Sequence, residues 1–182
     1  LHGMEGPMLA DGAAACVMTS ADHAKHRGIK TTVRVAGSGG CVSHYSIGQE
    51  ADLAVLGWAT AAKRAYEQSG WGPKDAQFGE IYDSYAAVTA VAVEGLGICP
   101  QGEGARWFES GAAKPGGKFP CNTNGGLLSA GHTGVGGGTA LLVEGIRQLL
   151  WRAEPERQIA NAQRCVIGGT GGSYMDAQVL LL

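Results

Sequence analysis

Glycine is the residue that most limits how this chain can fold. Of its 182 residues, 31 are glycine, whereas about 7% would be ordinary in a globular protein. The glycines follow neither a collagen period nor a serine-rich linker pattern, and they gather in short runs at residues 37–40, 116–117, 125–126, 136–138 and 168–172. Because glycine accepts backbone conformations that side chains forbid, these runs predict tight turns and close approach of backbone to backbone or to a ligand.

The rest of the composition indicates a globular chain with a sizeable buried core. Hydrophobic residues make up 45% and charged residues 16%, which is too little charge for a disordered segment. The net charge is -2 without any basic run, so nucleic acid is excluded as a partner. No apolar stretch is long enough to span a bilayer, and no signal peptide is recognisable. Because the chain starts at Leu1, we expect a fragment whose upstream part is absent.

The spacing of the cysteines argues against a structural role for sulfur. No CxxC pair occurs among Cys16, Cys41, Cys99, Cys121 and Cys165, so neither a zinc ribbon nor a disulfide framework is expected. Free thiols are typical of a reducing compartment, and we therefore expect a cytoplasmic protein.

Hydrophobic periodicity and turn residues predict a layered α/β domain. Strands are predicted at residues 13–18, 29–36, 78–82, 164–167 and 178–182. Helices are predicted at residues 20–27, 51–69, 84–96 and 139–151, with Ser20 and either Asp83 or Ser84 as N-caps. Residues 37–46 and 99–121 are predicted loops, and loops as long as the second are usually functional. This alternation of strands and helices is typical of an α/β fold.

Two segments carry polar groups where a ligand would bind in such a fold. The sequence Tyr82-Asp83-Ser84-Tyr85 lies at a strand-to-helix junction, and ligands of open α/β folds sit outside the carboxyl ends of strands. His132 lies between Gly131 and Thr133, before a predicted helix. A histidine donor at that position suits the stabilisation of a developing oxyanion. The alternatives are that Asp83 or Ser84 caps while Tyr82 packs, and that His132 belongs to a flexible surface loop.

Other candidate sites are weaker. His23 and His26 share one side of a short predicted helix, but no third metal ligand can be placed beside them, so no metal site is predicted. A nucleophilic pair of Cys41 and His44 lacks an orienting third group. The glycine runs contain neither GxxxxGK[ST] nor a dinucleotide-binding GxGxxG in its proper context, which excludes a nucleotide fold.

Three blocks of the sequence together resemble the thiolase superfamily, closest to its sterol-carrier-protein-like branch. EIYDSYAAVTAVAVEGLGICPQGEG at 80–104 resembles the family's "HDCF" or "YDSF" segment with its helix and "LGFC..GE" loop. PCNTNGGLLSAGHTG at 120–134 resembles "VNxxGGxxxxGHPxG". The third block is the strand–glycine turn–strand at 165–182, and DGAAA at 11–15 also matches a family strand. The resemblance covers essentially the whole chain.

The resemblance implies a fold of two similar halves in a five-layered α/β/α/β/α core. This chain would supply the second half plus the end of the first. Residues 1–48 would be the end of the N-terminal half with its connecting loop, and residues 49–182 the C-terminal domain. The family's nucleophilic cysteine would lie upstream of Leu1, so this chain would lack it.

The family motifs also imply roles for individual residues. His132 corresponds to the histidine of "GHP", an oxyanion-hole donor, although Thr133 replaces the proline. Tyr82 corresponds to the asparagine or histidine that opens "NEAF" or "HDCF". Cys165 stands near the acid/base cysteine of Cys-x-Gly, with Ile167 in place of the glycine. Within the second block, substrate-binding roles fall on Asn122 and Gly131.

Three functions follow from this resemblance. The first is a thiolase-type acyltransferase that performs Claisen condensation or thiolysis on a coenzyme A thioester, without a covalently bound cofactor. The second is a retro-aldolase of the lipid-transfer-protein type, acting on a 3-hydroxyacyl-CoA; Tyr82 favours it and His132 counts against it. The third is a non-catalytic subunit. The implied partners are an acyl-CoA, a second subunit in a homodimer or higher oligomer, and a small zinc-ribbon/OB-fold protein.

Overall fold

The computed structural model describes residues 3–30, 32–49, 52–54, 56–172 and 174–182. Its centre is one mixed sheet with the strand order β1–β4–β3–β2. The strands are β1 (Gly37–Val42), β2 (Phe78–Ile81), β3 (Cys165–Gly169) and β4 (Asp176–Leu181). Strands β2 and β3 are parallel, whereas β4 runs antiparallel to both of its neighbours. An isolated parallel bridge between Gly79 and Cys121 extends the sheet beyond β2.

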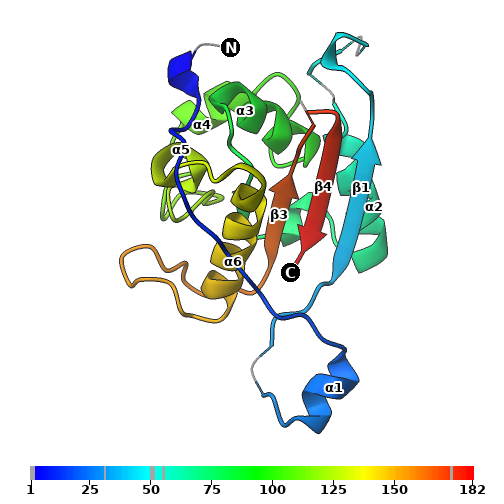
Figure 1. Cartoon of the computed structure of the whole chain (residues 1–182), viewed down its shortest axis with the longest axis vertical. Helices are drawn as coiled ribbons and strands as arrows, with labels where there is room; N and C mark the ends of the chain where they lie inside the picture. The colour runs from blue at the N-terminus through cyan, green and yellow to red at the C-terminus, as the bar shows by residue number, and fades with distance from the viewer. Residues whose placement is uncertain (1–2, 31, 50–51, 55, 173) are drawn as a thin grey trace.

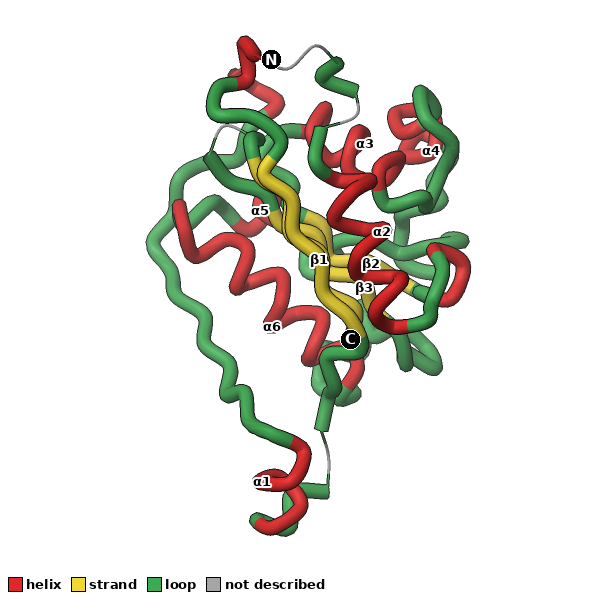
Figure 2. Tube along the Cα trace, turned by 90° about the vertical axis from the view of Figure 1, so that its right-hand side faces the viewer, coloured by secondary structure: helices red, strands yellow, loops and turns green. Residues whose placement is uncertain are grey.

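Helices cover both faces of the sheet, which gives three layers (Figures 1 and 2). On one face lie α2 (Trp58–Ser69) and α3 (Ala86–Gly95). The buried side of α2 carries Trp58, Ala61, Ala62 and Ala65, the spacing of a helix stripe that faces a core. Glycine in β1 lets this helix approach, because a Cβ at Gly39 would lie 2.0 Å from the carbonyl oxygen of Ala61.

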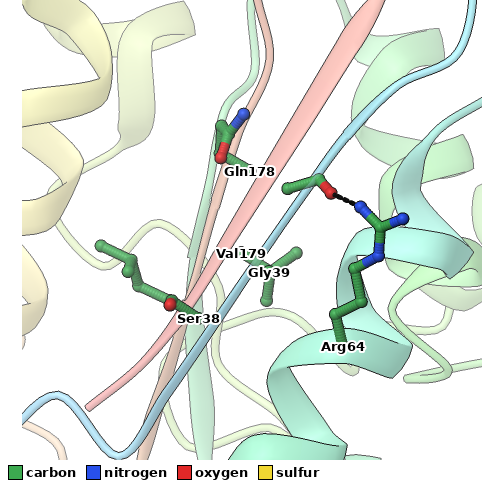
Figure 3. Close-up of a pocket in the computed structure, with 7 residues that line it drawn as sticks. Ser38, Gly39, Arg64, Gln178 and Val179 are labelled. Carbon is green, nitrogen blue, oxygen red and sulfur yellow. Dashed lines mark hydrogen bonds between the residues drawn. The ribbon is translucent and has the colours of Figure 1, made fainter.

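The opposite face carries α6 (Gly137–Leu149), which packs on β2 and β3. Gly145 makes the close packing possible, since a Cβ there would lie 2.6 Å from Cδ1 of Ile167. At the β1 edge of the sheet lies a cavity of about 370 Å³, lined by residues of β1, β4 and α2: Ser38, Gly39, Gly40, Arg64, Gln178, Val179 and Leu180. Figure 3 shows Arg64 donating a hydrogen bond across this edge to the carbonyl of Gly40.

The shorter helices are α1 (Ala21–His26), α4 (Gly104–Glu109) and α5 (Gly126–Ala130). Single 3-10 turns occupy Gly3–Glu5, Ile47–Gln49, Pro73–Asp75 and Gly134–Gly136. The N-terminal segment runs past α6 in extended form and then places α1 away from the body of the molecule (Figure 2). Among the described residues, no helix combines the length and the apolar character that a bilayer crossing requires.

Two predicted strands are wrong, and both errors have a physical reason. Residues 13–18 are extended but belong to no sheet, and the described residues of 29–36 form no strand, Thr31 lying outside the described part. The strand is instead Gly37–Val42, within the predicted loop 37–46. A strand needs a partner edge and a covered face more than it needs β-branched residues. The glycines of β1 allow α2 to pack closely on this strand, whereas the residues before β1 have larger side chains.

Other predicted boundaries hold or shift. Ser20 caps α1 by accepting from the backbone N–H of His23 at 3.2 Å, and Gly70 ends α2 with a φ of 73°. The predicted helix 51–69 begins only at Trp58; Ala51 and Val55 lie outside the described residues. The long loop 99–121 contains α4, and the two C-terminal strands enclose a glycine-rich turn as predicted. The mixed α/β class is confirmed.

Candidate functional site

The two residues singled out from the sequence, Tyr82 and His132, meet although 50 positions separate them. Tyr82 follows β2, where its N–H donates to the carbonyl of Gly168 at 2.8 Å. His132 lies between α5 and the turn that leads into α6. The hydroxyl oxygen of Tyr82 is 2.6 Å from Nε2 of His132, and the rings meet edge to face. Both side chains are half-buried, so the pair remains accessible to a ligand.

The proton positions of this pair follow from a third contact. The backbone N–H of Gly134 donates to Nδ1 of His132 at 2.9 Å. Nδ1 is therefore an acceptor, and the proton of a neutral imidazole resides on Nε2. The Nε2–H then donates to the Tyr82 oxygen, which leaves the phenolic hydrogen free for another acceptor. Burial, followed by the nearby Tyr174 and Asp83, raises the pKa of Tyr82 above its ordinary value, so Tyr82 is a hydrogen-bond donor at neutral pH.

The N-terminal segment holds His132 in place from outside. The His132 N–H donates to the carbonyl of Met8 at 2.8 Å, and the N–H of Ala10 donates to the carbonyl of His132 at 3.1 Å. Gly131 has a φ of 96°, and a Cβ there would lie 2.6 Å from that of Ala10. Only glycine fits this crossing, so Gly131 sets the approach of the two segments.

Asp83 does not cap the helix that follows it. The N-cap of α3 is Tyr85, without a side-chain bond. Instead, the Asp83 carboxylate accepts from the N–H groups of Leu127 at 2.8 Å and Leu128 at 3.3 Å, in the first turn of α5. Burial raises the pKa of Asp83, and the N–H donors counteract part of that rise. The predicted cap is corrected: Asp83 joins the end of β2 to the short helix that precedes His132.

Asn122 lies beside the end of β2, and its amide binds backbone. Its Oδ1 accepts from the Ile81 N–H at 2.7 Å, and its Nδ2 donates to the Ile81 carbonyl at 2.8 Å. These two hydrogen bonds fix the backbone of Ile81, the residue before Tyr82. Asn122 holds a φ of 50°, a left-handed conformation that asparagine tolerates better than most residues.

Cys165 is not brought to the Tyr82–His132 pair. It opens β3 in register with Phe78, three positions before Gly168, the residue that contacts Tyr82. At about 3.3 Å per residue, that is roughly 10 Å along the strand. The thiol is fully buried, and burial raises its pKa well above the ordinary value. It therefore has the character of an inert core thiol.

The hydroxyl of Tyr174, close to the pair, was not singled out from the sequence. Tyr174 lies in the turn between β3 and β4, and its hydroxyl is 3.5 Å from Oγ of the buried Ser84. Burial raises the pKa of Tyr174 while the contact with Ser84 lowers it, and the net direction is upward. Tyr174 has a φ of 67°, unusual for a residue with a side chain. In the sequence, the glycine run before Tyr174 indicates a sharp turn, but it does not show which residues the turn brings close to Tyr82.

Asp83 and Asn122 also line a pocket of about 570 Å³. Helices α3, α4 and α5 wall it, largely with alanine, and its lining residues are Asp83, Ala86, Ala87, Thr89, Ala90, Ala105, Phe108, Ala113, Lys114, Cys121, Asn122, Gly125 and Leu128. Its volume is that of a small-molecule site. The part of the chain that the structure describes holds no group of three or more histidine, cysteine or acidic residues able to bind a metal ion.

Known proteins with related sequences are thiolases and a lyase. Residues 39–182 match the family described as thiolase C-terminal domain-like. Benzoylsuccinyl-CoA thiolase subunit BbsB of Thauera aromatica is 33% identical over 160 residues, covering 84% of this chain and 41% of that protein. The Mycobacterium tuberculosis enzyme 17-hydroxy-3-oxo-4-pregnene-20-carboxyl-CoA lyase is 33% identical over 171 residues, covering 88% and 42%. The chain thus spans less than half the length of these relatives.

A solved structure supports the fold independently. The Ltp2-ChsH2(DUF35) aldolase superposes with a TM-score of 0.68 at 21% identity, over 80% of this chain and 38% of that one. At that identity the likeness concerns the fold alone. Sterol carrier protein 2 is also among the chain's relatives, as the sequence blocks predicted. With a family match over most of its length and relatives above 30% identity, the chain belongs to the thiolase superfamily.

Proposed function

We propose that this chain carries part of the active site of an enzyme that makes or breaks a carbon–carbon bond next to the carbonyl of a coenzyme A thioester. The observation that carries the proposal is the 2.6 Å contact between Tyr82 and His132, with the imidazole proton directed at the phenol. Enzymes of this superfamily act on coenzyme A thioesters, and both Claisen and aldol chemistry pass through an oxyanion on the thioester carbonyl. A fixed donor aimed at that oxygen is the catalytic device such chemistry needs.

In this arrangement Tyr82 is the group that meets the substrate. Because the Nε2–H of His132 donates to the Tyr82 oxygen, the phenolic hydrogen of Tyr82 is free to donate to the developing oxyanion. As negative charge grows on the substrate, the phenol acquires anionic character, and the His132 donor stabilises that change. His132 therefore acts through Tyr82, and Asn122 and Asp83 hold the end of β2 and α5 around the pair. Cys165 lies apart, so no step is assigned to it.

The second candidate, a retro-aldolase, is favoured by the extra hydroxyl of Tyr174 near Tyr82. In that reaction a 3-hydroxyl proton leaves, the bond between C2 and C3 breaks, and the enolate left on the thioester takes up a proton at C2. Two tyrosine hydroxyls can relay these protons without an enzyme cysteine. A lyase of 33% identity is a further reason to weigh this chemistry.

One experiment separates the candidates in the full-length protein. A 3-ketoacyl-CoA is supplied with coenzyme A, and a 3-hydroxyacyl-CoA is supplied without it, with products identified by mass spectrometry. Thiolysis of the first supports the acyltransferase, and release of a carbonyl product with a shortened acyl-CoA from the second supports the aldolase. Turnover of neither, in a folded protein, contradicts both and leaves the non-catalytic subunit.

The proposal extends to assembly and compartment. Residues 8–18 form an extended segment that, apart from the bridge between Leu9 and His132, pairs with no strand in the described part of the chain and exposes Met8, Leu9, Val17 and Met18. Exposed apolar segments of this size are typical of interfaces, so we propose that another part of the thiolase core, from the same protein or a second subunit, covers it. A zinc-ribbon/OB-fold partner remains part of the proposal, as does a cytoplasmic location, which the free thiols favour.

A further inference from the structure

A chain of buried polar side chains joins β2 to α6 behind the Tyr82–His132 pair. Glu80 on β2 and Glu144 on α6 are 0% and 2% exposed. Both contact the hydroxyl of Thr123, whose Oγ1 is 2.8 Å from Oε1 of each glutamate. Gln148 donates to the same hydroxyl at 3.0 Å. Two carboxyl groups therefore share one threonine hydroxyl in an environment without solvent contact.

Counting hydrogens shows that one carboxyl of this pair is protonated. A threonine hydroxyl has a single hydrogen and can donate only one bond. It has two acid oxygens at hydrogen-bond distance, so one of them must itself supply a hydrogen. Glu144 is the ionised partner, because Arg157 and Gln148 both donate to its Oε1. Burial alone would raise the pKa of Glu144, but the bonds from Arg157, Thr123 and Gln148 outweigh it and lower the pKa.

Glu80 has fewer donors than Glu144: its Oε1 faces the Thr123 hydroxyl and accepts from the Thr123 backbone N–H at 3.2 Å. Its Oε2 has no hydrogen-bond partner among the residues that the structure describes. The charged or titratable groups around it are Glu144, Asp83 and the thiols of Cys165 and Cys121, and none of them is a cation. Leaving the carbonyl oxygen of a neutral acid unbonded costs far less than leaving a buried carboxylate oxygen unbonded. The hydrogen therefore belongs to Glu80.

We propose that Glu80 is a neutral carboxylic acid that donates a hydrogen bond to Thr123, which in turn donates to the Glu144 carboxylate. This series of hydrogen bonds positions Tyr82 against the start of α6. Glu80 and Tyr82 are two positions apart, so both side chains point to the α6 face of the sheet. Gly145 of α6 packs beside Glu80, and Gly137, the first residue of α6, packs beside Tyr82. Thr123 follows Asn122, the clamp on Ile81. The assignment of Tyr82 as the beneficiary rests on the proposed function.

A pH dependence follows, with a definite sign. Burial, the largest cause, raises the pKa of Glu80 from 4.5 to about 8. A carboxyl with a raised folded-state pKa binds its proton more tightly when folded, so its stability contribution is complete below 4.5 and is lost as pH rises through about 8. Ionisation of Glu80 would place two carboxylates around one hydroxyl and push α6 from β2.

The test uses the full-length protein with the variants Glu80→Gln and Glu80→Ala, and Glu144→Gln as the matched control. Infrared difference spectra should show the carbonyl stretch of a protonated carboxyl in the wild type between pH 4.5 and about 8, and this band should be missing in Glu80→Gln. The amide can still donate to Thr123 but cannot ionise, so Glu80→Gln should unfold with a free energy that no longer falls across that pH interval. Glu144→Gln should keep the band, with a smaller pH slope because a nearby negative charge is removed, and it should lose more stability because it removes the buried carboxylate to which Arg157, Thr123 and Gln148 donate.

Turnover provides the second readout. Glu80→Ala frees Thr123 and should lower turnover by roughly 10²-fold, the effect of a misplacement of about 1 Å at a catalytic group, whereas Glu80→Gln should recover most of it and lack the wild-type decline above about pH 8. A wild type without the protonated-carboxyl band, or a Glu80→Gln variant with an unchanged stability slope, overturns the inference whatever the enzyme's activity. A band and slope as expected, with turnover equal in all Glu80 variants, overturns the link to Tyr82.

Discussion

At residue 82 the chain has a tyrosine where the family motif has asparagine or histidine, and in the proposed function this phenol is the group that meets the substrate. The motif blocks identified both Tyr82 and His132 from the sequence, because their flanking glycines and apolar positions are specific. They could not show that the imidazole proton points at the phenol. That depends on one backbone N–H, from Gly134, whose direction only the folded turn determines.

Removing the imidazole tests the support that Tyr82 receives. We expect His132→Ala in the full-length protein to lower turnover about 10²–10³-fold, the usual loss for one donor in an oxyanion site. The Michaelis constant should change less, because the contact strengthens as charge develops. His26→Ala, at an exposed position on α1, is the control and should behave as wild type. Equal losses in the two variants would point to a folding defect rather than to catalysis.

Tyr174 offers a prediction that separates the two chemistries. If its hydroxyl relays a proton in a retro-aldol reaction, Tyr174→Phe should reduce cleavage of a 3-hydroxyacyl-CoA at least about 10²-fold. Thiolysis of a 3-ketoacyl-CoA should change little. Tyr45→Phe, which removes a hydroxyl at a position that is 87% exposed, is the matched control. Unchanged steady-state rates for both substrates would remove Tyr174 from the site.

At the scale of elements, the sequence predicted helices and parallel strands better than it predicted the strand at the sheet edge. The spacing of Trp58, Ala62 and Ala65 correctly predicted helix α2. Strand β1 was missed because Gly37–Val42 contains three glycines, a composition that favours loops. What makes it a strand is its pairing with β4 and the close passage of α2, and neither is visible in a local window.

Close packing of α6 gives a stability prediction with its own control. Gly145→Ala would put a methyl group 2.6 Å from Ile167 and 3.2 Å from the Cys165 sulfur, so we expect a loss of about 1–3 kcal/mol in the free energy of unfolding. Gly138→Ala lies in the same helix with nothing within 4 Å of the new Cβ, and it should be neutral or gain up to about 1 kcal/mol. Chemical denaturation measures both. Equal effects would mean that α6 does not pack this closely on β2 and β3.

At the scale of the whole molecule, an alanine-rich segment near the start of the chain is extended but belongs to no strand. Residues 11–15 resemble a family strand, yet they join no strand among the residues that the structure describes. The predicted five-layered core needs a second sheet and its helices, and the described part of the chain shows three layers. A local sequence pattern can suggest such a strand, but it does not supply the partner edge that a strand needs.

The uncovered apolar surface predicts how the chain behaves alone. With Met8, Leu9, Val17 and Val135 between 83% and 105% exposed, the 182-residue chain should self-associate or bind a fluorescent hydrophobic dye. Its thermal unfolding should be broad. A monomer in sedimentation velocity with a sharp, cooperative transition would show that no further half or subunit is needed to complete the fold.

The central claim is that Tyr82 and His132 act as one catalytic unit, and a double-mutant cycle tests it most directly. The single-turnover rate of the full-length protein is measured for the wild type, Tyr82→Phe, His132→Ala and the double variant, on whichever acyl-CoA it turns over. Residues that act as a unit are strongly non-additive, so the account predicts that each single variant is slowed by roughly 10²-fold or more and that the double variant is about as slow as the slower single one. Losses that multiply in the double variant, or a Tyr82→Phe variant as fast as the wild type, would contradict it.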